Sequence, residues 1–153
     1  MKSPIDNSDF GLTADDYSKF RAGFPDSLFA KLKTFNIGIG NQRILDLGTG
    51  TGSLARGFAR NKNQVIGIDP AEEMLIAAKH MDQALKVNIE YHIAPAEDTG
   101  LDANQFDIVS AGQCWHWFDS KKATVEIRRL LKAQGTLLAV YYDWLPLQGN
   151  VVR

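Results

Sequence analysis

The stretch RILDLGTGTG, residues 43–52, decides the fold of this chain. Its first half is a short apolar run of the kind that forms a buried strand. Its second half places glycine at every second position, which allows a tight backbone turn. The next residues, 53–60, carry Leu54 and Phe58 on one helical face. The pattern therefore predicts a strand, a glycine turn and a helix whose first N–H groups are free to bind a ligand.

The same alternation of strand and helix continues along the chain. Strands are predicted at 43–47, 64–68, 88–93, 106–110 and 136–141, and helices at 53–60, 71–79 and 121–131. A further helix is expected after Asp26 until Gly38 and Gly40 end it, and a short one from Thr13. Alternating elements predict an α/β fold, a doubly wound and mostly parallel sheet of five strands with helices on both faces.

Ligands of such sheets bind at the carboxyl ends of the strands, so the glycine loop is the first candidate site. Gly48 and Gly50 fit a dinucleotide-binding fingerprint, but its third glycine is replaced by Ser53. The spacing is G-x-G-x-G instead, and Asp46 precedes it. A carboxylate there suits a ligand with an ammonium group and repels a pyrophosphate.

Asp69 follows the second predicted strand and supplies the second candidate carboxylate. A carboxylate in this loop can accept both hydroxyls of a ribose. Two other interpretations remain open at this stage. One is a glycine-rich turn with an incidental capping acid, and the other is a nicotinamide-dependent oxidoreductase.

Composition narrows the class of partner. The 153 residues carry a net charge of −1, so no basic excess points to nucleic acid. No apolar run approaches the roughly 20 residues of a membrane-spanning helix, and a cytoplasmic protein is expected. A single cysteine, Cys114, excludes an internal disulfide. His80 and His92 lack ligand spacing, so no metal site is predicted.

Two segments carry a family resemblance: LDLGTGTG (45–52) and VIGIDPAEEML (65–75). They resemble the first two motifs of class I S-adenosylmethionine-dependent methyltransferases, closest to the small-molecule branch that includes trans-aconitate methyltransferase-like proteins. Residues 17–29, 96–119 and 130–142 extend the likeness. The resemblance implies a Rossmann-like core, S-adenosylmethionine as cofactor and a small-molecule methyl acceptor.

The resemblance also implies a role for each matching position. These are Tyr17 and Arg21 at the cofactor carboxylate; Asp46, Gly48, Thr49, Gly50 and Gly52 around its methionine part; Asp69 at the ribose hydroxyls; Pro70, Met74, Ala96 and Glu97 at the adenine; and Gln113 beside the methyl group. Many relatives carry an acid or a hydroxyl where this chain has Pro95, which puts side-chain recognition of the adenine in doubt.

The resemblance divides the chain into N-terminal cap helices, residues 1–40, and a cofactor-binding core, residues 41–153. The family usually continues with two more strands, so the chain resembles a C-terminally truncated member. The fifth strand is then expected at an open sheet edge. A homodimer or the tail, residues 143–153, is expected to cover that edge.

Methyl transfer mainly needs alignment of acceptor, methyl group and sulfur, and a base only for some acceptors. His116 is the candidate base, with a packed or capping histidine as the alternative. Trp115 and Trp117 are expected mainly in the core, with an apolar acceptor pocket or contact with the cationic sulfonium as the alternative. Cys114 is expected as a buried residue that is no nucleophile. The competing function is a non-catalytic S-adenosylmethionine-binding domain.

Overall fold

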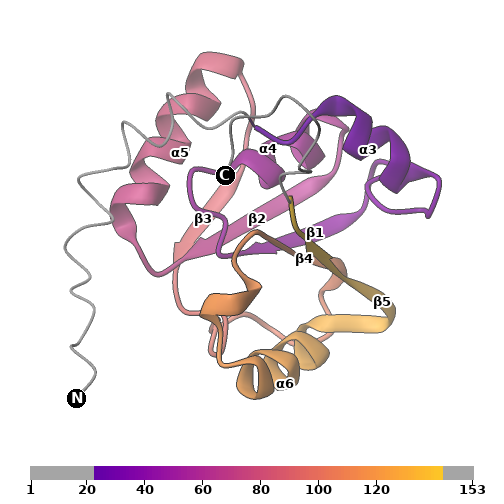
Figure 1. Ribbon diagram of the computed structural model, residues 1–153, viewed down its shortest axis with the longest axis vertical. Coiled ribbons are helices and arrows are strands. Elements are labelled where there is room, and N and C mark those ends of the chain that lie inside the picture. Colours follow the sequence, from indigo (N-terminus) through magenta and orange to yellow (C-terminus); the bar gives the residue numbers. More distant parts are fainter. Residues whose placement is uncertain (1–22, 143–153) are drawn as a thin grey trace, which may run out of the picture.

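A parallel sheet organises the computed structural model, which describes residues 23–142 (Figure 1). Its strands are β1 (Arg43–Leu47), β2 (Gln64–Asp69), β3 (Glu90–Ile93), β4 (Phe106–Gly112) and β5 (Leu131–Val140). They lie in the order β3-β2-β1-β4-β5, and every pairing is parallel. Since β1 lies between β2 and β4, the order reverses there, which is where such sheets bind ligands.

Helices cover both faces of the sheet. They are α3 (Asp26–Lys33), α4 (Ser53–Arg60), α5 (Glu72–Leu85) and α6 (Ser120–Leu130), and a 3₁₀ helix, η1, spans Trp115–Trp117. α3, α4 and α5 lie on one face and α6 on the other (Figure 1). The predicted α/β class, the five strands and the two helical layers are confirmed.

The core consists of two apolar layers, one on each side of the sheet. Phe29 of α3 and Phe58 of α4 pack edge to face, with ring centroids 5.4 Å apart, against one side of β1, β2 and β4. Ile127 and Leu130 of α6 pack against the other side. Successive β1 residues, Ile44 and Leu45, point into opposite layers, as the strand period of two requires. β1 is therefore buried on both faces and holds the glycine loop rigidly.

The strand register brings three loops together. Leu47, at the end of β1, pairs with Ile68 of β2 and Ala111 of β4. The segments that follow these three paired residues, 48–52, 69–71 and 112–114, therefore start at one level of the sheet. This is the edge at which the sequence placed the candidate site.

Several element boundaries differ from the prediction. α5 runs on to Leu85, past the predicted end at 79, and ends where Lys86 takes a left-handed conformation with φ 53°. Asp82 in the extra turn looks like a surface residue in the sequence, but in the structure it is buried and pairs with Arg56. β5 starts at Leu131 because that residue pairs with Phe106 before a register shift. α3 ends at Lys33, well before Gly38, and the helix expected from Thr13 lies outside the described residues.

β5 lies at an edge, as expected: within residues 23–142 it pairs with β4 alone. Leu137 and Tyr141 at this end of the sheet are 39% and 51% exposed. The homodimer stays a prediction, and the tail that was its alternative lies outside the described residues. None of the described helices is long and apolar enough to span a bilayer.

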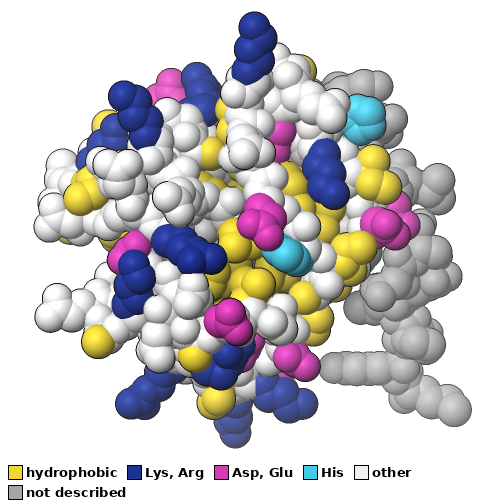
Figure 2. Space-filling view, turned by 180° about the vertical axis from the view of Figure 1, so that it is seen from behind, with side chains coloured by type: hydrophobic (Ala, Val, Ile, Leu, Met, Phe, Trp, Pro, Cys, Tyr) yellow, Lys and Arg dark blue, Asp and Glu magenta, His cyan; other side chains and the backbone are white. Residues whose placement is uncertain are grey.

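The two basic pairs of α6 lie on the surface of the molecule. Lys121, Lys122, Arg128 and Arg129 are exposed. Figure 2 shows Lys and Arg side chains gathered at that end of the molecule, while hydrophobic side chains show through the middle of the same view.

Candidate functional site

Two adjoining cavities lie at the carboxyl ends of the strands, with volumes of about 150 Å³ and about 500 Å³. Gly48, Gly50, Gly112 and Gln113 line both of them. These residues come from the glycine loop after β1 and from the end of β4. The two cavities thus form one cleft, and the glycine loop divides it into a smaller and a larger part.

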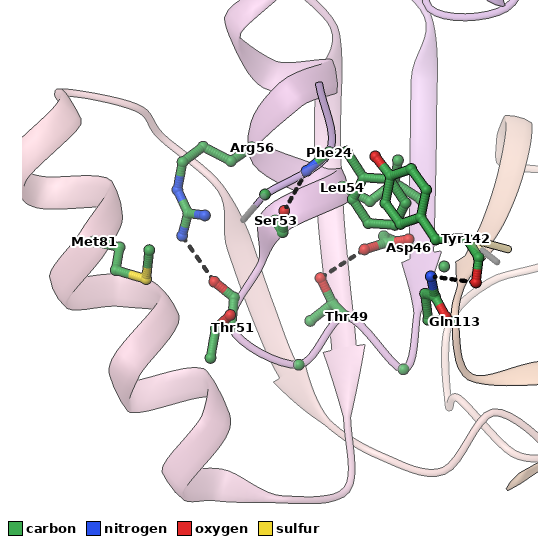
Figure 3. Close-up of a pocket in the computed structure, with 14 residues that line it drawn as sticks. Phe24, Asp46, Thr49, Thr51, Ser53, Leu54, Arg56, Met81, Gln113 and Tyr142 are labelled. Atoms are coloured by element: carbon green, nitrogen blue, oxygen red, sulfur yellow. Dashed lines mark hydrogen bonds between the residues drawn. The ribbon is translucent and has the colours of Figure 1, made fainter. Parts of the chain in front are cut away.

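The smaller part lies between the glycine loop and residues close to the ends of the described chain (Figure 3). Phe24 stacks on Tyr142 with ring centroids 4.9 Å apart, and both residues line the cavity. Gln113 Nε2 donates to the carbonyl of Tyr142 at 3.4 Å. Phe24 and Tyr142 were missed by the sequence prediction, because only the tertiary fold brings them to the loop.

The three glycines of the loop all adopt left-handed backbone conformations, with φ of 59°, 56° and 79° at Gly48, Gly50 and Gly52. Their missing side chains face different surroundings. A Cβ at Gly48 would lie 2.8 Å from Cys114 Sγ, and one at Gly52 would overlap Tyr91 Oη. A Cβ at Gly50 would meet nothing within 4 Å. Gly50 therefore leaves open space where the loop borders the cleft.

Asp46 is buried, and both of its carboxylate oxygens accept hydrogen bonds from within the protein. Thr49 Oγ1 donates to Oδ2 and Ser110 Oγ donates to Oδ1, each at 2.7 Å. Burial raises the pKa of Asp46 to about 6, against the lowering effect of the two hydroxyls. The sequence assigned this acid to the ligand ammonium. Its contacts show that it ties the loop to β4, and direct ligand contact stays a prediction.

Asp69 lies at the end of β2 and lines the larger part of the cleft. Its Oδ2 accepts the amide of Gly50 and its Oδ1 the amide of Ala71, both at 2.9 Å. Burial raises the pKa of Asp69, and the two amides oppose this shift. Two oxygens offer about four acceptor positions, so this carboxylate can accept two further donors. That capacity fits a ribose diol.

The loop after β4 forms the opposite wall. Gln113 has a left-handed backbone with φ 62°, and Cys114 Sγ donates to the carbonyl of Leu47 at 3.2 Å. Burial raises the pKa of Cys114 to about 12, which suits the predicted non-nucleophilic residue. Trp117 is 63% exposed and lines the cleft, so its expected place in the core is wrong. The turn of η1 directs Trp115 onto the core and Trp117 outward.

His116 is exposed and does not line either cavity. Its backbone N–H donates to Tyr141 Oη at 3.1 Å, and its ring Nδ1 lies 3.4 Å from the same oxygen. These contacts join the loop after β4 to the end of β5. Its role as a base stays a prediction. Within residues 23–142, no group of three or more His, Cys, Asp or Glu side chains is placed to hold a metal ion.

Most of the predicted cofactor positions meet at this cleft. Those that line it are Asp46, Gly48, Thr49, Gly50, Asp69, Pro70, Met74, Ala96, Glu97 and Gln113. Gly52 faces the protein interior instead, and Tyr17 and Arg21 lie outside the described residues. Gly112 was also missed, although its place two residues after a predicted strand was a usable signal.

A family model described as a methyltransferase domain matches residues 45–139, from β1 to β5. The chain belongs to the methyltransferase domain family. An uncharacterized methyltransferase of Mycobacterium bovis is 32% identical over 149 residues. That alignment covers 94% of this chain but only 58% of its relative, so the chain spans little more than half the length of that protein.

Solved structures give the same result for the fold. YcgJ of Bacillus subtilis is 31% identical, with a TM-score of 0.66 over 73% of this chain and 49% of its own. Phosphoethanolamine N-methyltransferase 2 of Haemonchus contortus, solved with S-adenosylmethionine, is 30% identical with a TM-score of 0.73. That match covers 84% of this chain and 32% of the nematode chain. The class I fold is confirmed, and the trans-aconitate branch stays a prediction.

Proposed function

We propose that this chain binds S-adenosylmethionine in the cleft and transfers its methyl group to a small molecule. The observation that carries the proposal is the arrangement around Gly50. Its amide donates to Asp69, its backbone is left-handed, and the space beyond it is open. One loop thus offers both a surface for a ligand and a fixed carboxylate beside it. The nematode relative, solved with S-adenosylmethionine, supports this choice of cofactor.

In this proposal the larger part of the cleft takes the adenosyl group. Asp69 accepts the two ribose hydroxyls with its remaining lone pairs. Pro70, Met74 and Ala96 supply apolar surface beside it, and all three line this part. The smaller part then takes the methionine portion, close to Asp46 and Thr49. The cofactor is divided in this way because Gly48, Gly50 and Gln113 line both parts of the cleft and so lie between them.

The cofactor supplies an electrophilic methyl group on a sulfonium sulfur. The residues of this chain then have to hold that group and the acceptor in line and exclude water. Gln113 lies where both parts of the cleft meet, and Trp117 and Phe118 line the wall beside it. Aromatic faces attract a cation such as a sulfonium and offer an apolar surface to a small acceptor. His116, at the outer side of this wall, is proposed as the base for acceptors that must lose a proton.

Calorimetric titration of the chain with S-adenosylhomocysteine, S-adenosylmethionine and NAD tests the cofactor assignment. We expect saturable binding of the two adenosyl ligands and no measurable binding of NAD, because the acid before the loop disfavours a pyrophosphate. NAD binding with no response to the adenosyl ligands would overturn the proposal. Binding without transfer of labelled methyl to any of a panel of small acceptors would favour the non-catalytic alternative.

Asp69→Ala removes the carboxylate that the proposal places at the ribose. We expect binding of S-adenosylhomocysteine to weaken by about 1.5–3 kcal/mol, the scale of hydrogen bonds to a charged group. Asp102→Ala is the control, because it also removes one carboxylate but from an exposed loop position that does not line the cleft. Equal dissociation constants for the two variants would take Asp69 out of the site.

A further inference from the structure

A buried ion pair lies next to the glycine loop, and its arginine, Arg56, also lines the smaller part of the cleft. Arg56 Nε of α4 donates to Asp82 Oδ1 of α5 at 2.8 Å. The two side chains are only 7% and 6% exposed. Tyr91 Oη of β3 donates to the other oxygen of Asp82 at 2.9 Å. We call these three residues, Arg56, Asp82 and Tyr91, the loop-support cluster.

The guanidinium group of this cluster also reaches the glycine loop. Arg56 Nη2 donates to the carbonyl of Thr51 at 2.8 Å, and Figure 3 shows the side chain directed at that carbonyl. Thr51 lies between Gly50, which borders the cleft, and Gly52, which does not. Both neighbours have left-handed backbones, which glycine leaves intrinsically free. A donor held rigidly against the Thr51 carbonyl removes that freedom.

Tyr91 supports the same loop through its ring. A Cβ at Gly67 of β2 would lie 2.6 Å from Tyr91 Cε1, and a Cβ at Gly52 would overlap the hydroxyl group. The tyrosine thus fills the space that these two glycines leave. Its hydroxyl then fixes Asp82, and Asp82 fixes the guanidinium group. The three contacts form a chain from β3 to the loop.

A buried ion pair is a poor way to gain stability alone, since apolar residues of similar volume often serve as well. Apolar residues cannot donate to a carbonyl in a fixed direction. We propose that Arg56 is a positioning residue for the cofactor loop, oriented by Asp82 and Tyr91. It fixes the peptide after Thr51 and thereby the Gly50 surface against which the cofactor lies. This inference rests on the proposed function.

Arg56→Lys tests the proposal, with Arg129→Lys as a matched control. Lysine keeps the positive charge, but it lacks the planar guanidinium group that can donate to a carboxylate and a carbonyl at the same time. Arg129 also donates to both a carboxylate and a backbone carbonyl, in another part of the structure. It pairs with Glu126 and donates to the carbonyl of Leu101 at 2.7 Å. Denaturant unfolding, calorimetry with S-adenosylhomocysteine and spectra of glycine-labelled protein are measured for both variants.

We expect Arg56→Lys to weaken ligand binding by about tenfold, the scale of one hydrogen bond to a charged donor. The amide resonances of Gly50 and Gly52 should shift in the same variant. Arg129→Lys should leave binding and both resonances unchanged. A purely structural role predicts lower unfolding stability with an unchanged dissociation constant, because the molecules that remain folded keep their site. That outcome, with unshifted loop glycines, would overturn the inference.

Tyr91→Phe is the second variant, for the case in which Arg56→Lys does not fold. It keeps the ring beneath the loop and removes only the hydroxyl that orients Asp82. We expect a smaller shift of the same glycine resonances and about threefold weaker binding, because the hydroxyl acts on the loop only through Asp82 and Arg56. If the wild-type chain binds no adenosyl ligand, the proposed function fails. The glycine spectra, recorded without ligand, still decide whether the cluster positions the loop.

Discussion

The two faces of the glycine loop differ in what lies beyond them. On the cleft face, the space beyond Gly50 is open, and its amide is held by the half-exposed Asp69. On the inner face, Gly52 packs against Tyr91, Ala78 and Arg56. Both glycines belong to one motif and share a left-handed backbone, yet only one borders the cleft. Glycines of one motif can therefore face opposite surroundings, one the open cleft and the other the packed interior.

Among the variants that test this comparison, Gly50→Asn should give the largest effect. Asparagine tolerates a left-handed backbone better than most residues, and its side chain would occupy the cleft. We expect binding of S-adenosylhomocysteine to weaken by about 100-fold or more, which corresponds to about 2.8 kcal/mol. Gly100→Asn is the control, because Gly100 also has a positive φ, 69°, and open space but lies outside the cleft. Similar affinity in both variants would contradict the assignment of the cleft face.

Gly52→Ala should instead affect folding. The added methyl group overlaps Tyr91 Oη and lies 3.3 Å from Ala78 Cβ, on a backbone with φ 79°. We expect the free energy of unfolding to fall by about 2–3 kcal/mol, from overpacking and backbone strain together. Urea unfolding measures this fall. Gly40→Ala controls for the strain, since its φ is 98° and its nearest neighbour, Asn61 O, is 3.6 Å away.

A double variant sharpens this test. Tyr91→Phe removes the hydroxyl that the new methyl group would overlap, so it should restore part of the stability lost in Gly52→Ala. Strictly additive losses in the double variant would show that the overlap is not the cause. Glycine would then be required at position 52 only because of its left-handed backbone conformation.

The smallest expected effect is a pH dependence of the free energy of unfolding that arises from Asp46. Its pKa is raised from 3.8 to about 6 by burial, so the folded protein keeps a proton that the unfolded chain releases between these values. Stability should therefore fall as the pH rises through this window. From about pH 5 to about pH 7 the wild type should lose about 1 kcal/mol relative to Asp46→Asn. Urea unfolding of both proteins measures this difference, and a constant difference would mean an ionised Asp46 throughout.

The strands, and the edge of the sheet at which the cleft lies, were predictable from the sequence because they depend on local patterns. Buried parallel strands such as β1 and β2 read as continuous apolar runs. Carboxyl ends of neighbouring parallel strands must meet, which placed Asp46 and Asp69 at one edge. The end of α5 was not predictable, because Asp82 looks like a surface residue until Arg56 pairs with it. Trp117 was misplaced for a similar reason, since residue type alone does not show which way the short η1 turns.

Sequence alone determined the strand, glycine turn and helix of residues 43–60, and with them the family and the edge of the sheet at which the cleft lies. Apolar spacing and the conformational freedom of glycine are properties of the local chain. They can therefore be recognised in the sequence without knowing which residues lie nearby in the fold. Only the tertiary structure decided that Gly52 faces Tyr91 while Gly50 faces the cleft, and that Arg56 supports the loop between them. Those contacts join residues of β3, α4 and α5, and their distances depend on how the elements pack.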